Sequence, residues 1–373
     1  MKKYSATISL LIACALSSFA NDNSPYINKV YEYAPAPGQF INTAISYYEE
    51  GDFYSDVLQK VNTALVGKKN GLVTLGAYGG YIVIGFDHTI ANVAGGYDFK
   101  IYGNASSTGS EPGIVMVSAD ANGDGLPNDE WYEIAGSEFG NKSIYYDYRI
   151  TYHRPNPDNG DVRWTDNNGS EGYVHRVPAH TQATYYPEWV EGETLVFEGT
   201  RLPGNAVNRG TDDVPYWSLE AYEWGYADNQ PNNSDYSNFK IEWAIKKDHT
   251  PANLKGIDFI KVYTGVAQEC GSLGETSTEV SGIEDLHPDA PIGIEDAEAS
   301  GFAIYPTLFN EHFFALSPVE AVVTVYNLLG NRVLRQSISM GNNEIATPHL
   351  QNGYYTICIE SAGKTVVFKA VKR

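Results

Sequence analysis

Hydrophobic and polar residues alternate along much of the first 290 residues, a pattern that is typical of β-strands. The alternating stretches are rich in β-branched and aromatic residues, and turn-forming residues bound most of them. A parallel α/β fold would need a helix between most of the strands, and the pattern lacks such helices. We therefore predict an all-β fold, a large antiparallel sandwich of jelly-roll type, with strands at 80–86, 97–103, 113–119, 146–154, 193–199, 239–245 and 257–265.

One segment follows the period of a helix instead. Ser55 can cap its N-terminus, and Gly67 fits its C-terminal end. The sequence therefore predicts one short helix, whose apolar stripe is formed by Val57, Leu58, Val61, Ala64 and Leu65.

The chain changes character near residue 288. Residues 288–300 combine two prolines with acidic and small residues and contain no aromatic residue, which is typical of a linker. We expect one folded unit over residues 21–287 and a second over residues 301–373. In the second unit, the spacing of short strands and turns is typical of a small Ig-like β-sandwich, with turns at Gly330, Gly341, Gly353 and Gly363.

The N-terminus has the features of an export signal. Lys2 and Lys3 precede a short apolar run, and small residues end at Ala20, so residues 1–20 are predicted to be a signal peptide. The run is too short to span a bilayer, and no other segment is predicted to do so. An alternative is a lipobox in which Cys14 is lipidated.

The charge of the chain limits its partners. The 373 residues include 25 Lys and Arg against 46 Asp and Glu, which gives a formal net charge of −21. Such a surface repels phosphate backbones, so nucleic acid is not an expected partner, whereas cations and uncharged ligands are suitable. The sequence has no G-x-S-x-G, H-E-x-x-H or C-x-x-C motif, so nucleophilic catalysis and zinc binding find no support.

The segment DANGDGLPNDEWYE (residues 120–133) places oxygen-bearing side chains at alternate positions directly after a predicted strand. Calcium takes roughly six to eight oxygen ligands, and such side chains can converge in a curled loop. Trp131 stands where an EF-hand has its closing glutamate, so we expect a strand-borne loop with a structural Ca²⁺; a metal-free turn is the alternative. The expected ligands are Asp120, Asn122, Asp124, the Leu126 carbonyl, Asn128, and Asp129 or Glu130.

Two further loops mix acids and amides with aromatic residues. Flat aromatic faces pack against sugar rings, and amides and carboxylates bond hydroxyl groups, so these loops are candidates for a ligand site. The alternative is that they are structural loops on the rim of the sandwich. The candidate residues are Trp164, Asp166, Asn167, Tyr173, Trp224, Tyr226, Asp228 and Asn229.

The segment after the linker resembles the C-terminal sorting domain of the type IX secretion system. The resemblance is carried by AIYPTLFN (303–310), VTVYNLLGNRV (323–333), LQNGYYTICI (350–359) and the basic end KTVVFKAVKR (364–373). One departure is Thr307-Leu308, where the family usually has Asn-Pro. The resemblance implies that residues 301–373 engage the secretion machinery and that the chain reaches the cell surface or the extracellular space.

Residues 26–287 resemble a family of Bacteroidetes cell-surface proteins whose genes often lie beside outer-membrane uptake genes, including those for corrinoids. The motifs that carry this resemblance include GGYIVIGFDHTIANVAGGYDFKIYGNA, EPGIVMVSADANGDGLPNDEWYEIAGSE and WGYADNQPN. The resemblance implies an extracellular binding module without assigned catalytic residues. We expect a calcium-stabilised, non-catalytic protein that binds a glycan or another small nutrient. The alternatives are a corrinoid-binding protein, a glycoside hydrolase and a structural adhesin.

Overall fold

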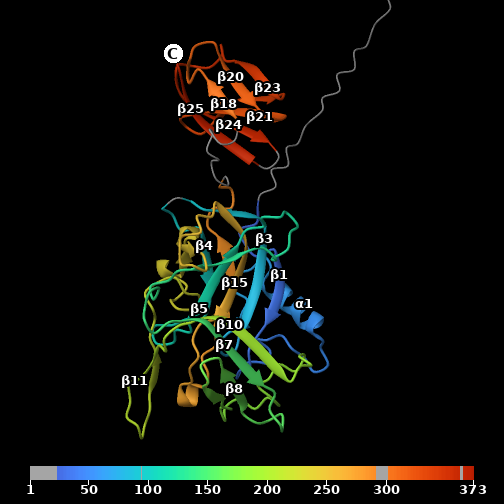
Figure 1. Ribbon diagram of the computed structural model, residues 1–373, viewed down its shortest axis with the longest axis vertical. Helices are drawn as coiled ribbons and strands as arrows, with labels where there is room; N and C mark the ends of the chain where they lie inside the picture. Colours follow the sequence, from blue (N-terminus) through green and yellow to red (C-terminus); the bar gives the residue numbers. More distant parts are fainter. Residues whose placement is uncertain (1–22, 94, 291–300, 362–363) are drawn as a thin grey trace, which may run out of the picture.

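The computed structural model describes residues 23–93, 95–290, 301–361 and 364–373 (Figure 1). The predicted signal peptide, Cys14 and most of the predicted linker at 288–300 lie outside these residues. Strands dominate the described chain, and the prediction of an almost entirely β protein with one short helix is confirmed.

A six-stranded sheet is the largest element of the first unit. Its order is β1-β3-β15-β5-β6-β14, and every neighbouring pair is antiparallel. The central strand, β15, is buried along nearly its whole length. The strands are β1 (Lys29–Ala34), β3 (Tyr81–Ala91), β15 (Gly256–Thr264), β5 (Gly113–Ser118), β6 (Trp131–Ile134) and β14 (Ala244–Ile245).

Smaller antiparallel sheets surround this one. A four-stranded sheet has the order β10-β7-β8-β9, made of β10 (Thr194–Arg201), β7 (Tyr145–His153), β8 (Val162–Asp166) and β9 (Glu171–Val174). A three-stranded sheet has the order β13-β4-β17, made of β13 (Asn238–Phe239), β4 (Phe99–Tyr102) and β17 (Gly282–Asp285). Two strand pairs complete the unit: β11 (Ala206–Asn208) with β12 (Trp217–Leu219), and β16 (Glu279–Val280) with β2 (Val73–Thr74).

Both faces of the six-stranded sheet are buried, in two different hydrophobic cores. Val115 and Val117 of β5 lie in the first core, together with helix α1, whereas Ile114 of the same strand lies in the second core. Successive side chains of a strand point to opposite faces, so one strand can contribute to both cores. The second core also contains Tyr148 and Tyr152 of β7, which joins the four-stranded sheet to the larger one.

Helix α1 (Tyr54–Leu65) lies beside β1 (Figure 1), and its buried residues are Val57, Val61 and Leu65, as the apolar stripe predicts. Its N-cap is Phe53 and not Ser55, because the Asp56 carboxylate accepts the Phe53 N–H at 2.9 Å and starts the first turn earlier. Gly67 follows the helix at φ +69°, as expected for a C-terminal stop. No helix of the described residues is long and apolar enough to cross a membrane.

The prediction of one continuous strand at 239–245 is wrong. The Asp98 carboxylate accepts the N–H of Ile241 at 2.6 Å, so this donor is lost to the strand ladder. The chain turns through a 3₁₀ helix there, and its two ends join different sheets as β13 and β14. The 3₁₀ helices of the unit are η1 (Asp235–Ser237), η2 (Ile241–Trp243) and η3 (Gly271–Leu273).

The second unit is a small sandwich with its own hydrophobic core (Figure 1). One sheet has the order β18-β20-β23, made of β18 (Ala303–Tyr305), β20 (His312–Ser317) and β23 (Gly341–Ala346). The other has the order β19-β25-β24-β21-β22, made of β19 (Leu308–Phe309), β25 (Lys364–Lys372), β24 (Gly353–Ser361), β21 (Ala321–Asn327) and β22 (Arg332–Ile338). The pair β19–β25 is parallel, and the other pairs are antiparallel.

Candidate functional site

The Asp120 loop (residues 120–130) joins β5 to β6 and is curled around its first side chain. The Asp120 carboxylate accepts the N–H groups of Gly123 at 2.8 Å and Gly125 at 2.9 Å. Both glycines have φ near +70° (73° and 72°), a conformation that costs other residues free energy. The loop is fastened to the sheet because Asp258 of β15 accepts the Asp120 N–H at 2.7 Å.

The remaining side chains of the loop bond to one another. The Asp124 carboxylate accepts from the side-chain amides of Asn122 at 3.2 Å and Asn128 at 2.8 Å. An amide presents either nitrogen or oxygen after rotation of its last torsion, so the same side chains can turn oxygens to a cation. The Asp129 carboxylate accepts the Ala121 N–H at 3.0 Å and ties the two ends of the loop together.

Two other expected ligands are engaged locally. The Leu126 carbonyl accepts the Asn128 N–H at 2.9 Å, and the Glu130 carboxylate accepts the Tyr132 hydroxyl at 2.8 Å. Asp129 is therefore better placed than Glu130 to close the loop.

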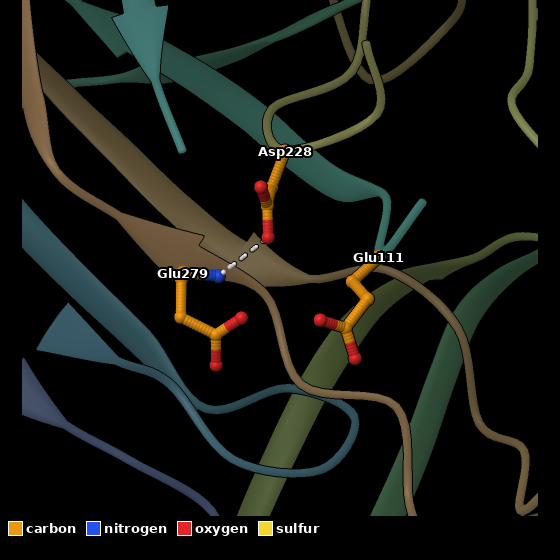
Figure 2. A group of neighbouring side chains, drawn as sticks. All are labelled: Glu111, Asp228 and Glu279. Carbon is orange, nitrogen blue, oxygen red and sulfur yellow. Dashed lines mark hydrogen bonds between the residues drawn. The ribbon is translucent and has the colours of Figure 1, made fainter. Parts of the chain in front are cut away.

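A different set of acids is drawn together inside the fold. Glu111, Asp228 and Glu279, the carboxylate trio, have ligand atoms within 4.8 Å of one another, the one group of three or more metal-ligating side chains found this close among the described residues. Figure 2 shows the side chains of Glu111 and Glu279 extending toward the same space beneath Asp228. The trio is assembled from three distant segments, so sequence spacing could not reveal it.

Hydrogen bonds hold each member of the trio in place. Asp228 accepts the N–H groups of Asn104 at 2.7 Å, Ala105 at 2.8 Å and Glu279 at 3.0 Å. The Glu279 carboxylate accepts the Ser277 hydroxyl at 3.0 Å, and Glu111 accepts the backbone N–H of Ser277 at 3.2 Å. These donors fix the carboxylates without neutralising them.

Burial is the main cause of the raised pKa values of the three carboxyl groups in the trio. Burial, and then the charge of Glu111, raise the pKa of Asp228 to about 7. Burial also raises the pKa of Glu111 and raises that of Glu279 well above its ordinary range. None of the shifts in the trio has a basic side chain as a cause. The trio can therefore hold protons at neutral pH or exchange them for a cation.

A cavity of about 310 Å³, the aromatic pocket, lies between the four-stranded sheet and the segments that flank the larger sheet. Trp164 of β8 and Tyr173 of β9, both predicted as ligand residues, line it together. A Cβ at Gly172 would lie 2.5 Å from the Trp164 ring, so glycine allows that ring to lie against β9. The full lining is Ala77, Tyr78, Ile150, Tyr152, Trp164, Gly172, Tyr173, Val174, His175, Ala267, Gln268, Glu269 and Glu275.

Glu275 is the unusual member of this lining. Its side chain is buried, with 3% of the residue exposed, and its Oε1 accepts the Gln39 N–H at 2.6 Å. Its Oε2 is buried and has no hydrogen-bond partner among the described residues. Burial raises the pKa of Glu275 to about 8. Glu269 differs, because its carboxylate holds the His175 ring at 2.5 Å and raises the pKa of His175.

The other predicted ligand residues do not line this pocket. Asp166 accepts the N–H groups of Asn168 and Ser170, and Asn167 bonds the backbone of β7, so both shape the β8–β9 turn. Trp224 packs against Trp243 with ring centroids 4.4 Å apart.

Tyr226 and Asn229 are buried in the loop that also contains Trp224, and this loop does not line the aromatic pocket. The Tyr226 hydroxyl accepts the Glu138 N–H, and the Asn229 side chain bonds both backbone groups of Tyr222. The two predicted ligand loops are therefore not brought together into one pocket, and Asp228 belongs to the carboxylate trio.

A second cavity, of about 370 Å³, begins where the Asp120 loop ends. Trp131 and Glu133 of β6 line it together with Tyr146, Glu198 and His249. The Glu133 carboxylate accepts the Thr200 hydroxyl at 2.6 Å, and burial raises the pKa of Glu133 to about 7. Lys246 and Lys247 also line this cavity, unlike the aromatic pocket.

Glu111, Glu275 and Glu279 were not singled out by the sequence analysis. The one signal is the run ETSTE at residues 275–279, in which two acids enclose three hydroxyl residues. Glu275 and Glu279 are both buried, which is unusual for acids that have no basic partner among the described residues.

The trio predicts a specific dependence of stability on pH. Its acids have folded pKa values above their unfolded values, so their contribution to stability is present below about pH 4 and is lost as the pH rises toward the folded pKa of Asp228, about 7. Glu279→Gln removes one of these acids. In buffer without divalent cations, urea unfolding should then show a smaller loss of unfolding free energy across this range, by up to about 1.4 kcal/mol per pH unit. The exposed Glu191→Gln is the control, and identical profiles for all three proteins would contradict the prediction.

Comparison with known protein families gives one match. Residues 303–373 match the model of the secretion system C-terminal sorting domain, which covers nearly the whole second unit. No curated protein matches the chain significantly. The chain thus carries a type IX sorting domain and is exported to the cell surface or the extracellular space.

Proposed function

We propose that residues 23–290 form a non-catalytic binding module that takes a small organic ligand into the aromatic pocket outside the cell. One observation carries this proposal: Glu275 lines a pocket walled by aromatic rings, and its buried Oε2 has no hydrogen-bond partner among the described residues. A buried polar atom without a partner costs folding free energy, and a bound ligand that bonds to it removes this cost.

The size and lining of the pocket limit the ligand. A volume of about 310 Å³ is near the lower end of the range for small-molecule sites. The aromatic faces of Trp164 and Tyr173 suit the C–H faces of a sugar or a nutrient of similar size. A corrinoid needs a wider apolar basin, so this pocket favours a small ligand over a whole corrinoid. A structural adhesin would not need such a pocket.

Calcium at the Asp120 loop is the second part of the proposal. The loop places the side chains of Asp120, Asn122, Asp124, Asn128 and Asp129 on one short curl, and hydrogen bonds already impose that curl. Calcium would offset most of the negative charge of Asp120, Asp124 and Asp129 at the end of β5 and would stabilise the chain where it enters β6. The trio is a second place with the right ligand atoms, but its oxygens are buried.

The pocket is tested by ligand-induced changes in melting temperature. The exported full chain is screened against a panel of small sugars, amines and a corrinoid. One class should raise the melting temperature, and Trp164→Ala should weaken that binding at least about tenfold because an aromatic wall is lost. Tyr216→Ala is the matched control, since Tyr216 is exposed and lies on the β11–β12 hairpin away from the pocket. Binding that survives in the Trp164 variant would place the ligand elsewhere.

The calcium site is tested by chelation. Calcium in large excess should stabilise the chain by about 1–3 kcal/mol, given a dissociation constant on the order of 10⁻⁴–10⁻³ M. EDTA should remove this effect, and Asp120→Ala combined with Asp124→Ala should abolish it. Asp213→Ala, at an exposed acid outside the loop, should retain it. The same melting temperature with EDTA and with calcium would exclude the site.

Glycoside hydrolysis is a second candidate, and the second cavity favours it. Glu133 and Glu198 line this cavity together with Trp131 and Tyr146, and Glu133 has the raised pKa that a general acid needs. Incubation with oligosaccharides should then release reducing ends, and Glu133→Gln should reduce the rate at least about a hundredfold. A chain that releases none with any oligosaccharide of the panel speaks against this candidate.

A further inference from the structure

We propose that the aromatic pocket binds an organic cation, that is, a protonated amine or a quaternary ammonium group, which contacts the Glu275 carboxylate and the surrounding aromatic faces. This inference rests on the proposed binding function and names the chemical class of its ligand.

Apart from His175, which is paired with Glu269, the charged residues of the pocket are acidic. Glu269 and Glu275 line it, and its lining contains no Lys or Arg among the described residues. Glu269 already has a partner in His175, whereas Glu275 Oε2 has none in the part of the chain that the structure describes. A cation placed at Oε2 would therefore bond the one acidic oxygen of the lining that the fold leaves free.

The walls of the pocket suit the rest of such a ligand. Tyr78, Tyr152, Trp164 and Tyr173 surround it with aromatic rings. The face of an aromatic ring carries negative electrostatic potential and attracts ammonium groups, most strongly for Trp, and the attraction grows when water is excluded. A neutral ligand of the same shape would gain the apolar contacts but not this attraction.

The surroundings of Glu275 strengthen the preference for positive charge. Glu111 and Glu269 act on it with negative charge, and the rings of Tyr152 and Tyr185 are close enough to feel its own charge. No basic side chain is among the causes of the raised pKa of Glu275, and the Arg176 guanidinium carbon lies 5.0 Å from the centroid of the Tyr185 ring. Behind Glu275, the carboxylate trio adds acids without basic partners. A cation would relieve this accumulation of negative charge.

Protonation gives the proposal a second readout. Burial raises the pKa of Glu275 to about 8, so a cation that binds below this pH must displace a proton from the carboxyl group. Affinity for a permanent cation should therefore rise with pH up to about 8, by at most about tenfold per pH unit, and then level off. His175 also lines the pocket. Its protonation at lower pH repels a cation, so it too should lower the affinity for a cation as the pH falls.

Choline and 3,3-dimethyl-1-butanol are the probes, because the second replaces the charged nitrogen of the first by carbon and has nearly the same shape. Isothermal titration calorimetry on the exported full chain should show choline binding at least about tenfold more tightly than its isostere. Choline does not titrate, so any pH dependence of its affinity comes from the protein. Proton release is measured by repeating the titration in buffers of different ionisation enthalpy.

Three variants test which side chains are responsible for choline binding and for its dependence on pH. Glu275→Gln keeps an oxygen for the Gln39 N–H but removes the charge, so it should weaken choline binding about tenfold at pH 9 and flatten the pH profile. His175→Gln should leave most of the pH profile intact. Tyr173→Ala changes a side chain that is 48% exposed, so it should fold normally and still weaken choline binding.

The outcomes separate this inference from the binding function itself. Equal affinity for choline and its isostere, or choline binding that ignores Glu275→Gln and Tyr173→Ala, overturns the cation proposal. A sugar that binds through Trp164 while choline does not bind also overturns it and leaves the binding module intact. If neither sugars, amines nor choline bind, both proposals fail.

Discussion

The fold depends on one sheet that is buried on both of its faces. β15 pairs with β3 and β5 along its length, so its backbone groups are satisfied within the sheet, and its side chains alternate between two cores. Removal of this strand would divide the sheet into the pair β1-β3 and the group β5-β6-β14. This sheet and the segments next to it carry the Asp120 loop, Glu111 of the carboxylate trio and part of the walls of both cavities. The positions of these sites are therefore set by a rigid scaffold and not by the loops alone.

The interior of the first unit is rich in acids for which no basic partner is found among the described residues. An ionised carboxylate is costly to bury, so these groups stay protonated or find a cation. Glu275, Glu279 and Asp228 are each less than 4% exposed, whereas the chain as a whole has surplus acids and could have kept them all on its surface. Buried acids lower the free energy of unfolding at neutral pH, and such a loss of stability is typical of functional sites.

The sequence was sufficient where local pattern decides the structure. The apolar alternation at 113–119 and 257–265 identified β5 and β15, and the stripe from Val57 to Leu65 identified the helix. The prediction at 239–245 failed because Asp98, far away in the chain, takes the Ile241 N–H, and no local pattern contains that contact. The prediction of the sorting domain succeeded because its motifs are specific over a whole unit. In the same way, the aromatic side chains of Trp164 and Tyr173 can be recognised as ligand candidates in the sequence. The importance of Glu275 cannot, because its burial and its unpaired oxygen are properties of the folded structure.

The arrangement of the second unit sets the order in which the chain can fold. β25 is an interior strand, since it pairs with β24 on one side and with β19 on the other. Residues 364–372 come after the other strands of this sandwich, so it stays open, with β19 unpaired in its sheet, until they have been synthesised. All strands of the first unit precede them and can assemble earlier. A chain interrupted before β25 would therefore lack a closed sorting domain, even with the first unit complete.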